Sequence, residues 1–290
     1  MTYPDFLQVV EMHIRERVEP ELSVETYAVN KNNGVRRDGV ILRDPLYVCA
    51  PIFYLDDFYD LYQNGYEIEY IVDDIMKRYA ALMPAYGDVR HLDEYELIKK
   101  DLRFKLVNYE KNKEQIKGAP YIPYKDLAVI FYVNVPIDGQ DGLIFVDEHL
   151  FEPWNVETQE MFRQAKENMR VSCPVRFFPM ADYLRQHGAA DLDDTDCGFI
   201  FVVTNEKLNY GASVILYDHL LEDIAHFFDS SFYIIPSSVH EILVIPERYV
   251  LPGCELNTMI REVNCMAVAS DEILADHYYY YDREMKTLSH

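Results

Sequence analysis

Short apolar runs typical of strands alternate with amphipathic stretches typical of helices along the whole chain. The clearest strand is Leu127 to Val135, which is dominated by β-branched and other large apolar residues. The clearest helix is Ile68 to Leu82, whose apolar residues return every three or four positions. A chain with this alternation can bury its apolar faces by packing helices on sheets. The sequence therefore predicts an α+β fold with mixed β-sheet layers and packed helices.

Glycine and proline cluster near the middle of the chain, at Gly118, Pro120 and Pro123. Such residues end helices and strands, so the cluster is a candidate domain boundary. It divides the chain into an N-terminal α+β region, 1–118, with a helix, a hairpin and further helices, and a C-terminal α+β domain, 119–290. The alternative is that the cluster separates two layers of one domain.

The N-terminal hairpin has a specific turn signal. Two β-rich runs, Val24 to Asn30 and Val35 to Arg43, flank Asn33 and Gly34. Asparagine and glycine readily adopt the positive φ angles of a hairpin turn. We therefore expect these two runs to pair with each other.

The chain is strongly acidic and rich in tyrosine. It carries 50 acidic and 27 basic residues, a formal net charge of −23, with 24 tyrosines and a single tryptophan. A surface of this charge repels phosphate backbones, which argues against direct binding of nucleic acid. It could attract a basic protein, imitate a nucleic acid, or simply keep the chain soluble. Tyrosine is also frequent at protein interfaces.

The cysteines and the N-terminal segment indicate the cellular compartment. The five cysteines are an odd number, and none forms a C-x-x-C pair. They are expected to remain reduced. The first residues mix Glu, Arg and His with apolar residues, unlike a signal peptide, and no run is long and apolar enough to span a membrane. The expected location is the cytoplasm, without membrane contact.

One segment has side chains that could bind a metal ion. On a helix from Tyr217 to Phe228, four side chains would share one stripe: His219, Glu222, Asp223 and His226. Imidazoles and carboxylates are ligands for zinc and other divalent ions. The spacing is not that of the H-E-x-x-H metalloproteases, and the polar face of an amphipathic helix explains the same residues. A divalent metal is therefore a secondary hypothesis, and no cofactor is predicted.

A second segment has candidates for catalysis. Ser238, His240 and Glu241 lie in a polar stretch between two apolar strands, where binding residues often gather. A serine and a histidine could act as nucleophile and base, although no G-x-S-x-G motif surrounds the serine. The alternative is a hairpin loop whose serines cap backbone groups. Phosphate-binding loops of the G-x-x-x-x-G-K-[ST] and G-x-G-x-x-G types are absent from the sequence.

Several stretches together resemble an uncharacterised bacterial family, a domain of unknown function common in gut anaerobes. The stretches are Ala50–Leu55, Leu106–Asn112, Lys125–Ala128, Tyr210–Ser213, Pro236–Glu241 and Tyr279–Glu284. This resemblance covers nearly the whole chain. From about residue 125 onward the chain is also similar to a second uncharacterised family of bacterial cytoplasmic proteins. Neither resemblance implies an activity.

The leading functional hypothesis is a non-catalytic cytoplasmic protein that binds or regulates another protein, a basic one, through its acidic, Tyr-rich surface. The predicted binding residues are Tyr210, Ser237, Ser238 and His240. The first alternative is a metal-dependent or serine-type hydrolase, and the second is an acidic mimic of nucleic acid. The sequence does not predict an oligomeric state, and it favours a protein that is not an enzyme.

Overall fold

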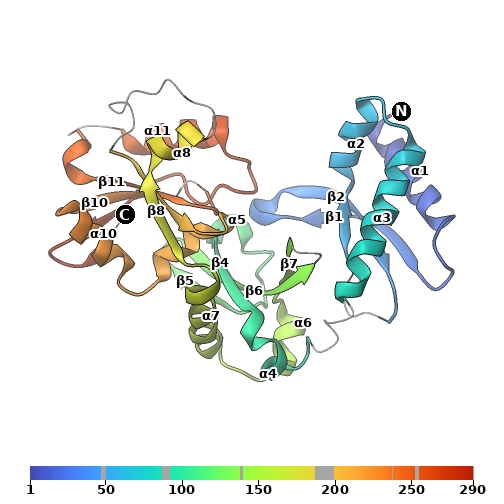
Figure 1. Ribbon diagram of the computed structural model, residues 1–290, viewed down its shortest axis with the longest axis horizontal. Helices are drawn as coiled ribbons and strands as arrows, with labels where there is room; N and C mark the ends of the chain where they lie inside the picture. The colour runs from blue at the N-terminus through green and yellow to red at the C-terminus, as the bar shows by residue number, and fades with distance from the viewer. Residues whose placement is uncertain are drawn as a thin grey trace.

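A computed structural model describes residues 1–46, 50–86, 92–137, 140–186, 199–236, 238–251 and 255–289. Helices and three antiparallel sheets make up these residues, which confirms the α+β class (Figure 1). Mixed strand order was expected, whereas every strand pairing in the described ranges is antiparallel. The reason is that most paired strands are consecutive in the chain and are joined by turns or loops, as in β1–β2, β5–β6 and β10–β11. Within the described ranges, no helix is long and apolar enough to cross a membrane.

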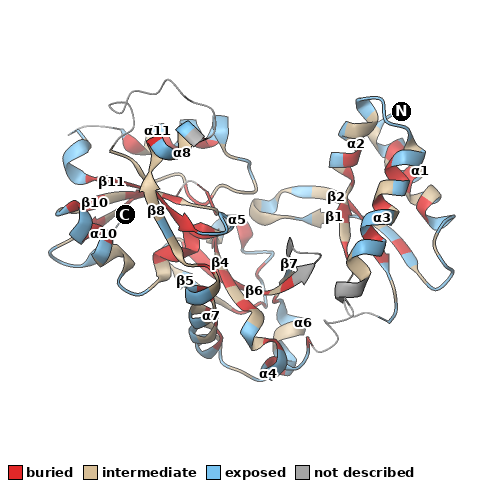
Figure 2. Ribbon diagram, in the orientation of Figure 1, coloured by how far each residue is buried: buried red, intermediate tan, exposed pale blue. Residues whose placement is uncertain are grey.

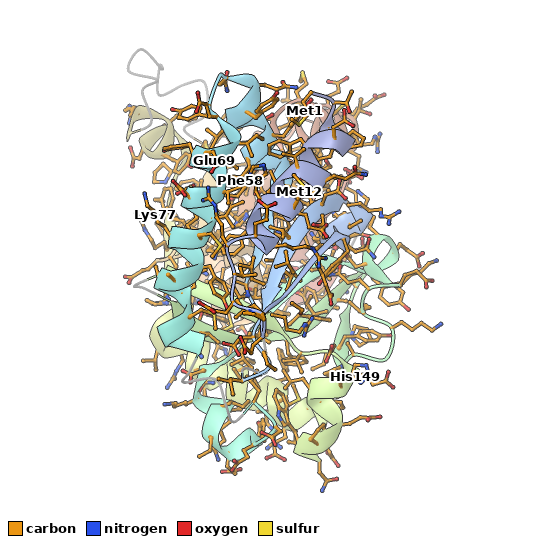
Figure 3. All side chains as sticks on the ribbon, turned by 90° about the vertical axis from the view of Figure 1, so that its right-hand side faces the viewer. Met1, Met12, Phe58, Glu69, Lys77 and His149 are labelled. Carbon is orange, nitrogen blue, oxygen red and sulfur yellow. The ribbon has the colours of Figure 1, made fainter. Side chains whose placement is uncertain are left out.

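The first part of the chain forms a small unit of three helices on a three-stranded sheet. Its elements are α1 (Tyr3–Arg15), β1 (Ser23–Asn30), β2 (Arg36–Arg43), β3 (Ile52–Tyr54), α2 (Leu55–Gln63) and α3 (Ile68–Tyr86). Thr2 and Asp5 form a capping box that begins α1. Figure 3 shows α1 and α3 side by side on the outer side of this unit, with Met12 and Lys77 labelled. Their apolar faces enclose a separate core that includes Phe6, Leu42 and Ile75.

The predicted hairpin is present, and its tip contacts the rest of the molecule. Asn33 and Gly34 have φ angles of 60° and 70° in the short 3-10 turn η1 (Asn32–Gly34). The backbone N–H of Asn33 donates to Oδ1 of the buried Asn112 at 2.8 Å, and its side-chain amide donates to the carbonyl of Ile273 at 2.7 Å. Figure 1 shows the β1–β2 hairpin pointing toward α5. The turn is therefore a polar bridge between the two parts of the molecule.

The larger part contains two sheets. The first has strand order β4-β6-β5 with β7 on β6, and its strands are β4 (Leu102–Asn108), β5 (Tyr121–Tyr124), β6 (Leu127–Ile137) and β7 (Gln140–Phe145). The second has strand order β13-β12-β10-β11-β9-β8. Its strands are β8 (Val175–Pro179), β9 (Phe201–Asn205), β10 (Phe232–Ile235), β11 (Ile242–Pro246), β12 (Tyr279–Asp282) and β13 (Thr287–Ser289).

Helices and 3-10 turns cover and connect these sheets. They are α4 (Tyr95–Ile98), η3 (Lys99–Asp101), α5 (Tyr109–Asn112), α6 (Glu148–Phe151), η4 (Glu152–Trp154), α7 (Thr158–Ser172), α8 (Met180–Gln186), η5 (Gly211–Leu216), α10 (Leu220–Phe228), η6 (Glu247–Tyr249) and α11 (Leu256–Ala267). One large core joins both sheets and includes Phe104, Phe131, Val244 and Tyr279, and the buried turn η5 also belongs to it. Figure 2 shows the buried residues concentrated along these strands.

The hydrophobic cores divide the chain at a different place from the glycine–proline cluster. Strand β4 pairs along its full length with β6, so one sheet runs across the predicted boundary at residue 118. The core of the first unit ends with the residues of α3, and the first buried residue of the larger core is Leu92. Gly118 and Pro120 lie in the connection between α5 and β5 instead.

Candidate functional site

Two polar segments of the larger part lock together around Gly211. A Cβ atom on Gly211 would lie 2.0 Å from Oγ1 of Thr204 and 2.5 Å from the carbonyl oxygen of His240, so no side chain fits there. The Thr204 hydroxyl donates to that same carbonyl at 2.7 Å, and the backbone N–H of Ala212 donates to the carbonyl of Val239 at 3.2 Å. The segment after β9 is therefore held tightly against the β10–β11 connection.

Tyr210 and His240 form a stacked pair on this support. Their ring centroids are 5.5 Å apart with an interplanar angle of 19°. The backbone N–H of Tyr210 donates to Nδ1 of His240 at 3.2 Å, so a neutral His240 carries its proton on Nε2. Nε2 lies 3.4 Å from a carboxylate oxygen of Glu272. Tyr210 has a φ of 51°, in the left-handed region that bulky residues rarely adopt and that is frequent at functional sites.

Ser238 and His240 do not form the hydrogen bond of a nucleophile and its base. Ser238 is buried, and its Oγ accepts a hydrogen bond from the backbone N–H of His240 at 3.0 Å. Both imidazole nitrogens face other partners, the Tyr210 N–H and Glu272. The serine therefore acts here as a cap for the backbone, as the hairpin-loop alternative expected. Ser237, the other predicted binding residue of this segment, lies outside the described residues.

Glu241 is a half-buried acidic group. Burial raises the pKa of its carboxyl, and the nearby His240 and the Ser238 hydroxyl offset that shift only in part. Within the described part of the chain, Glu241 takes part in no ion pair. A half-buried carboxylate without a cation is costly, so its site favours a positively charged group.

Ser238, His240 and Glu241 line a cavity of about 460 Å³, which lies between α8, β9, β11 and α11. One end is polar and contains Thr204, Ser238, His240, Glu241 and Glu272. The walls are apolar and include Phe178, Met180, Tyr183, Val202, Leu243 and Val263. Apolar walls with a few converging polar groups are typical of binding sites. We call this space the acidic cavity.

The outer face of α11 extends the acidic cavity onto the surface. Met259, Val263 and Met266 are spaced four and three residues apart, and their exposed fractions are 53%, 50% and 80%. This spacing places them on one side of the helix. We call these three residues the α11 stripe. Methionine adapts its shape easily, and exposed methionines are frequent at surfaces that bind partners of varied sequence.

The four predicted metal-binding residues gather around a different depression. His219, Glu222, Asp223 and His226 all line it, together with the cations Arg283 and Lys286. Glu222 accepts a hydrogen bond from Nζ of Lys286 at 2.5 Å. In the described ranges, no three His, Cys, Asp or Glu side chains are placed to hold a metal ion. Cationic side chains of the protein, Arg283 and Lys286, therefore lie beside these carboxylates, where a metal ion would otherwise bind.

The helix that carries these residues begins later than the sequence suggests. It was expected from Tyr217, whereas α10 begins at Leu220 and His219 precedes it with a φ of 66°. Tyr217 instead donates its hydroxyl to the carbonyl of Cys173 at 3.0 Å. The imidazole of His219 is therefore not on the helical stripe that the spacing argument assumed.

Sequence reasoning missed three parts of this region. Glu272 and Thr204 come from segments without a recognisable motif, and the loop after α11 brings Glu272 to the cavity. The α11 stripe was also missed, although Met259, Val263 and Met266 are visible in the sequence as an apolar face at helical spacing. Such a face is normally buried, so only the fold shows that it is exposed.

Residues 3–283 match the model of DUF5688, a family of unknown function. The extent of this match confirms the resemblance to an uncharacterised family that the sequence motifs indicated. Neither a curated protein nor a solved structure matches the chain. The chemistry of the site must therefore be argued from its own geometry.

Proposed function

Because the chain belongs to DUF5688, a family of unknown function, we propose a function from its own geometry: it is a non-catalytic protein-binding protein. The acidic cavity receives a long cationic side chain, arginine or lysine, from a basic amphipathic helix of the partner. The apolar face of that helix packs on the α11 stripe. The observation that carries this proposal is the Glu241 carboxylate, which forms no ion pair among the described residues and lies at the polar end of a cavity with apolar walls.

The shape of the acidic cavity fits an arginine or lysine better than a purely apolar residue. Both side chains have an apolar stem and a charged end. The stem would contact walls such as Phe178 and Leu243, and the charge would reach Glu241 and Glu272. Such a pairing also reduces the cost of a half-buried carboxylate that lacks an ion-pair partner among the described residues.

The surface around the acidic cavity also suits a basic amphipathic helix as the partner. The exposed α11 stripe offers an apolar contact beside the cavity, as in helix-in-groove recognition. Acidic residues accompany it, among them Glu262 on α11 itself. The net charge of −23 would draw a basic partner toward the protein and repel a second copy of this chain.

The proposal contains no covalent step. Ser238 Oγ already accepts from the His240 backbone, and Nδ1 of His240 accepts from Tyr210, so neither is arranged as an activated nucleophile or its base. The hypothesis of an acidic nucleic-acid mimic remains a prediction. It would be favoured over the present proposal if the protein competed with DNA for a DNA-binding protein.

Fluorescence anisotropy with a synthetic amphipathic helix of leucine and arginine tests the proposal. The same helix with glutamate in place of arginine is the control peptide. We expect only the arginine peptide to bind, and Glu241→Gln to weaken its binding by about tenfold or more, as for other buried charge pairs. Equal binding of the two peptides, or full affinity in Glu241→Gln, would refute the proposal.

A matched pair of surface variants tests the α11 stripe. Met266→Ser removes an exposed methionine of the stripe, and Met285→Ser removes a similarly exposed methionine outside the cavity lining. We expect Met266→Ser to weaken peptide binding several-fold and Met285→Ser to leave it unchanged. If Met266→Ser instead abolished a dimer of this protein in solution, the stripe would be the interface with a second copy.

A further inference from the structure

A second, smaller cavity lies beside the Tyr210 ring of the stacked pair. Its volume is about 60 Å³, and its polar lining consists of Arg103, Tyr132, Asn134, Lys207, Asn209 and Tyr210. The residues come from β4, β6 and the segment after β9, so packed strands fix two of its sides. Tyr132 is buried, and its ring lies 5.9 Å from that of Tyr210. We call this space the basic cavity.

Arg103 brings a guanidinium group to the basic cavity. Its Nη1 donates to two backbone carbonyls, of Lys100 at 3.0 Å and of Leu102 at 2.9 Å. Among the described residues, no carboxylate forms an ion pair with Arg103. A guanidinium has five N–H donors, so donors remain for a ligand.

Two lysines add positive charge next to the basic cavity. Lys105 follows Arg103 by two positions on β4, on the same face of the strand, and its Nζ lies 4.2 Å from the centroid of the Tyr210 ring. Lys31 comes from the other part of the molecule, and its Nζ lies 4.0 Å from the centroid of the Tyr54 ring. Burial lowers the pKa of Lys105 to about 8, and the charge of Lys31 contributes to that shift. The two ammonium groups therefore repel each other across the junction.

This concentration of positive charge contrasts with the rest of the protein. The chain has almost twice as many acidic as basic residues, 50 against 27, and many surface cations are paired with a carboxylate. Within the described ranges, Lys31 and Lys105 take part in no such pair; each contacts an aromatic ring instead. A cation–π contact stabilises an ammonium group without neutralising it. An anion in the basic cavity, which shares the Tyr210 ring with Lys105, would reduce this repulsion.

We propose that the basic cavity binds a compact oxyanion of phosphate size, which the Arg103 guanidinium contacts directly. The side-chain amide of Asn209 in the lining would donate a further hydrogen bond, and Lys105 and Lys31, which lie outside the lining, would add positive charge nearby. A cavity of about 60 Å³ has room for a few water molecules or one tetrahedral oxyanion. The planar fork of arginine matches two oxygens of such an anion. This site is independent of the partner proposed for the acidic cavity.

Because Lys31 lies at the contact between the two parts of the molecule, binding of the oxyanion should also affect the stability of that contact. Lys31 directly precedes the polar turn that bridges the first unit to α5 and the 269–275 loop, and Lys105 belongs to the larger part. Relief of their repulsion should stabilise the contact between the two parts. Phosphate should therefore raise the melting temperature of the protein.

Isothermal titration of the full-length protein with inorganic phosphate tests the proposal. We expect saturable binding that Arg103→Gln weakens by about tenfold or more, since a charge-assisted bidentate contact is lost. Arg103→Lys should give intermediate binding, because it keeps the charge and loses the fork. Lys100→Gln is the matched control, because this exposed lysine two residues before Leu102 does not line the basic cavity. It should bind phosphate as the wild type does.

The outcomes separate the possible ligands and the ways in which the proposal can fail. Tighter binding of methyl phosphate than of phosphate would identify the end of a phosphate ester as the ligand, and the reverse order would identify free phosphate. Absence of binding, equal binding in a folded Arg103→Gln, or acetate binding as tight as phosphate would overturn the proposal. Circular dichroism establishes that each variant is folded. As a second readout, phosphate should raise the pKa of Lys105, measured by NMR of ¹³C-methylated lysines.

Discussion

Two histidine–carboxylate pairs in the larger part of the molecule have nearly the same geometry and different surroundings. Nε2 of His240 lies 3.4 Å from Glu272, and Nε2 of His277 lies 3.5 Å from Asp126. The first pair opens on the acidic cavity. The second pair is packed at the start of β6, where the buried Tyr279 of β12 donates its hydroxyl to the same carboxylate.

The surroundings decide what each pair can do. The hydrogen bonds from His277 and Tyr279 outweigh the effect of burial and hold the pKa of Asp126 at about 2, and the hydrogen bond to Asp126 raises the pKa of His277. This network connects the two sheets, and both groups that face the Asp126 carboxylate, His277 and Tyr279, belong to the protein itself. The polar end of the acidic cavity contains Glu241, which forms no ion pair with any residue that the structure describes. The comparison teaches that the same chemical pair stabilises the fold where a buried tyrosine also donates to its carboxylate, as for His277 and Asp126 (the enclosed pair), and remains available to a ligand where it borders a cavity, as for His240 and Glu272 (the open pair).

The largest expected effect is the loss of the support beneath His240. In Gly211→Ala the added Cβ would collide with Oγ1 of Thr204 and the His240 carbonyl. We expect a loss of about 3 kcal/mol or more in the free energy of unfolding, at the upper end of overpacking effects. Urea denaturation measures it.

Gly65→Ala is the matched control for this substitution. Gly65 has a φ of 94°, and an added Cβ would meet no atom within 4 Å. Its cost is then only the conformational strain of about 1 kcal/mol. If Gly211→Ala were as stable as Gly65→Ala, the two segments around His240 would not be locked together as described.

The enclosed pair should contribute more to stability than the open pair. We expect Asp126→Asn to cost about 1–2 kcal/mol in the free energy of unfolding, a value that allows for the partial exposure of Asp126. Thermal unfolding of this variant and of Glu272→Gln compares the two pairs directly. A larger loss of stability in Glu272→Gln than in Asp126→Asn would show that the pair of His240 and Glu272 contributes more to the stability of the fold.

The contribution of the enclosed pair should depend on pH in a defined way. The folded-state pKa of Asp126 is lowered, so its contribution is present above about pH 4 and is lost as the pH falls toward 2. The folded-state pKa of His277 is raised, so its contribution is complete below about pH 6 and is lost as the pH rises through that pKa. The difference in Tm between wild type and Asp126→Asn should therefore be largest between about pH 4 and pH 6. A difference independent of pH would contradict the network.

The smallest effect is expected from the open pair. Glu272 is 44% exposed in its side chain, so Glu272→Gln should change the free energy of unfolding by less than about 0.5 kcal/mol. The same variant should weaken binding of the arginine peptide, because one of two carboxylates at the polar end of the acidic cavity is lost. An effect on stability without an effect on binding would make Glu272 a structural residue.

Local patterns in the sequence predicted individual elements well. The positive φ angles of Asn33 and Gly34 follow from turn chemistry, and the apolar run from Leu127 to Val135 forms the predicted strand, as part of β6. The boundary between the cores was not visible, because the pairing of β4 with β6 is a contact between distant segments. The sequence singled out Ser238, His240 and Glu241, and their roles depend on Thr204, Tyr210 and Glu272, which reach them only through the fold.

In the proposed complex, the carboxylate of Glu241 binds a cationic side chain of the partner in the acidic cavity. Its titration by ¹³C NMR of the side-chain carboxyl, in the free protein and with the arginine peptide, tests this most directly. We expect a raised pKa of Glu241 in the free protein, in line with its burial, and a clear fall of that pKa when the peptide binds. An unchanged pKa of Glu241 at saturating peptide would contradict the account, because the bound cation would then lie elsewhere.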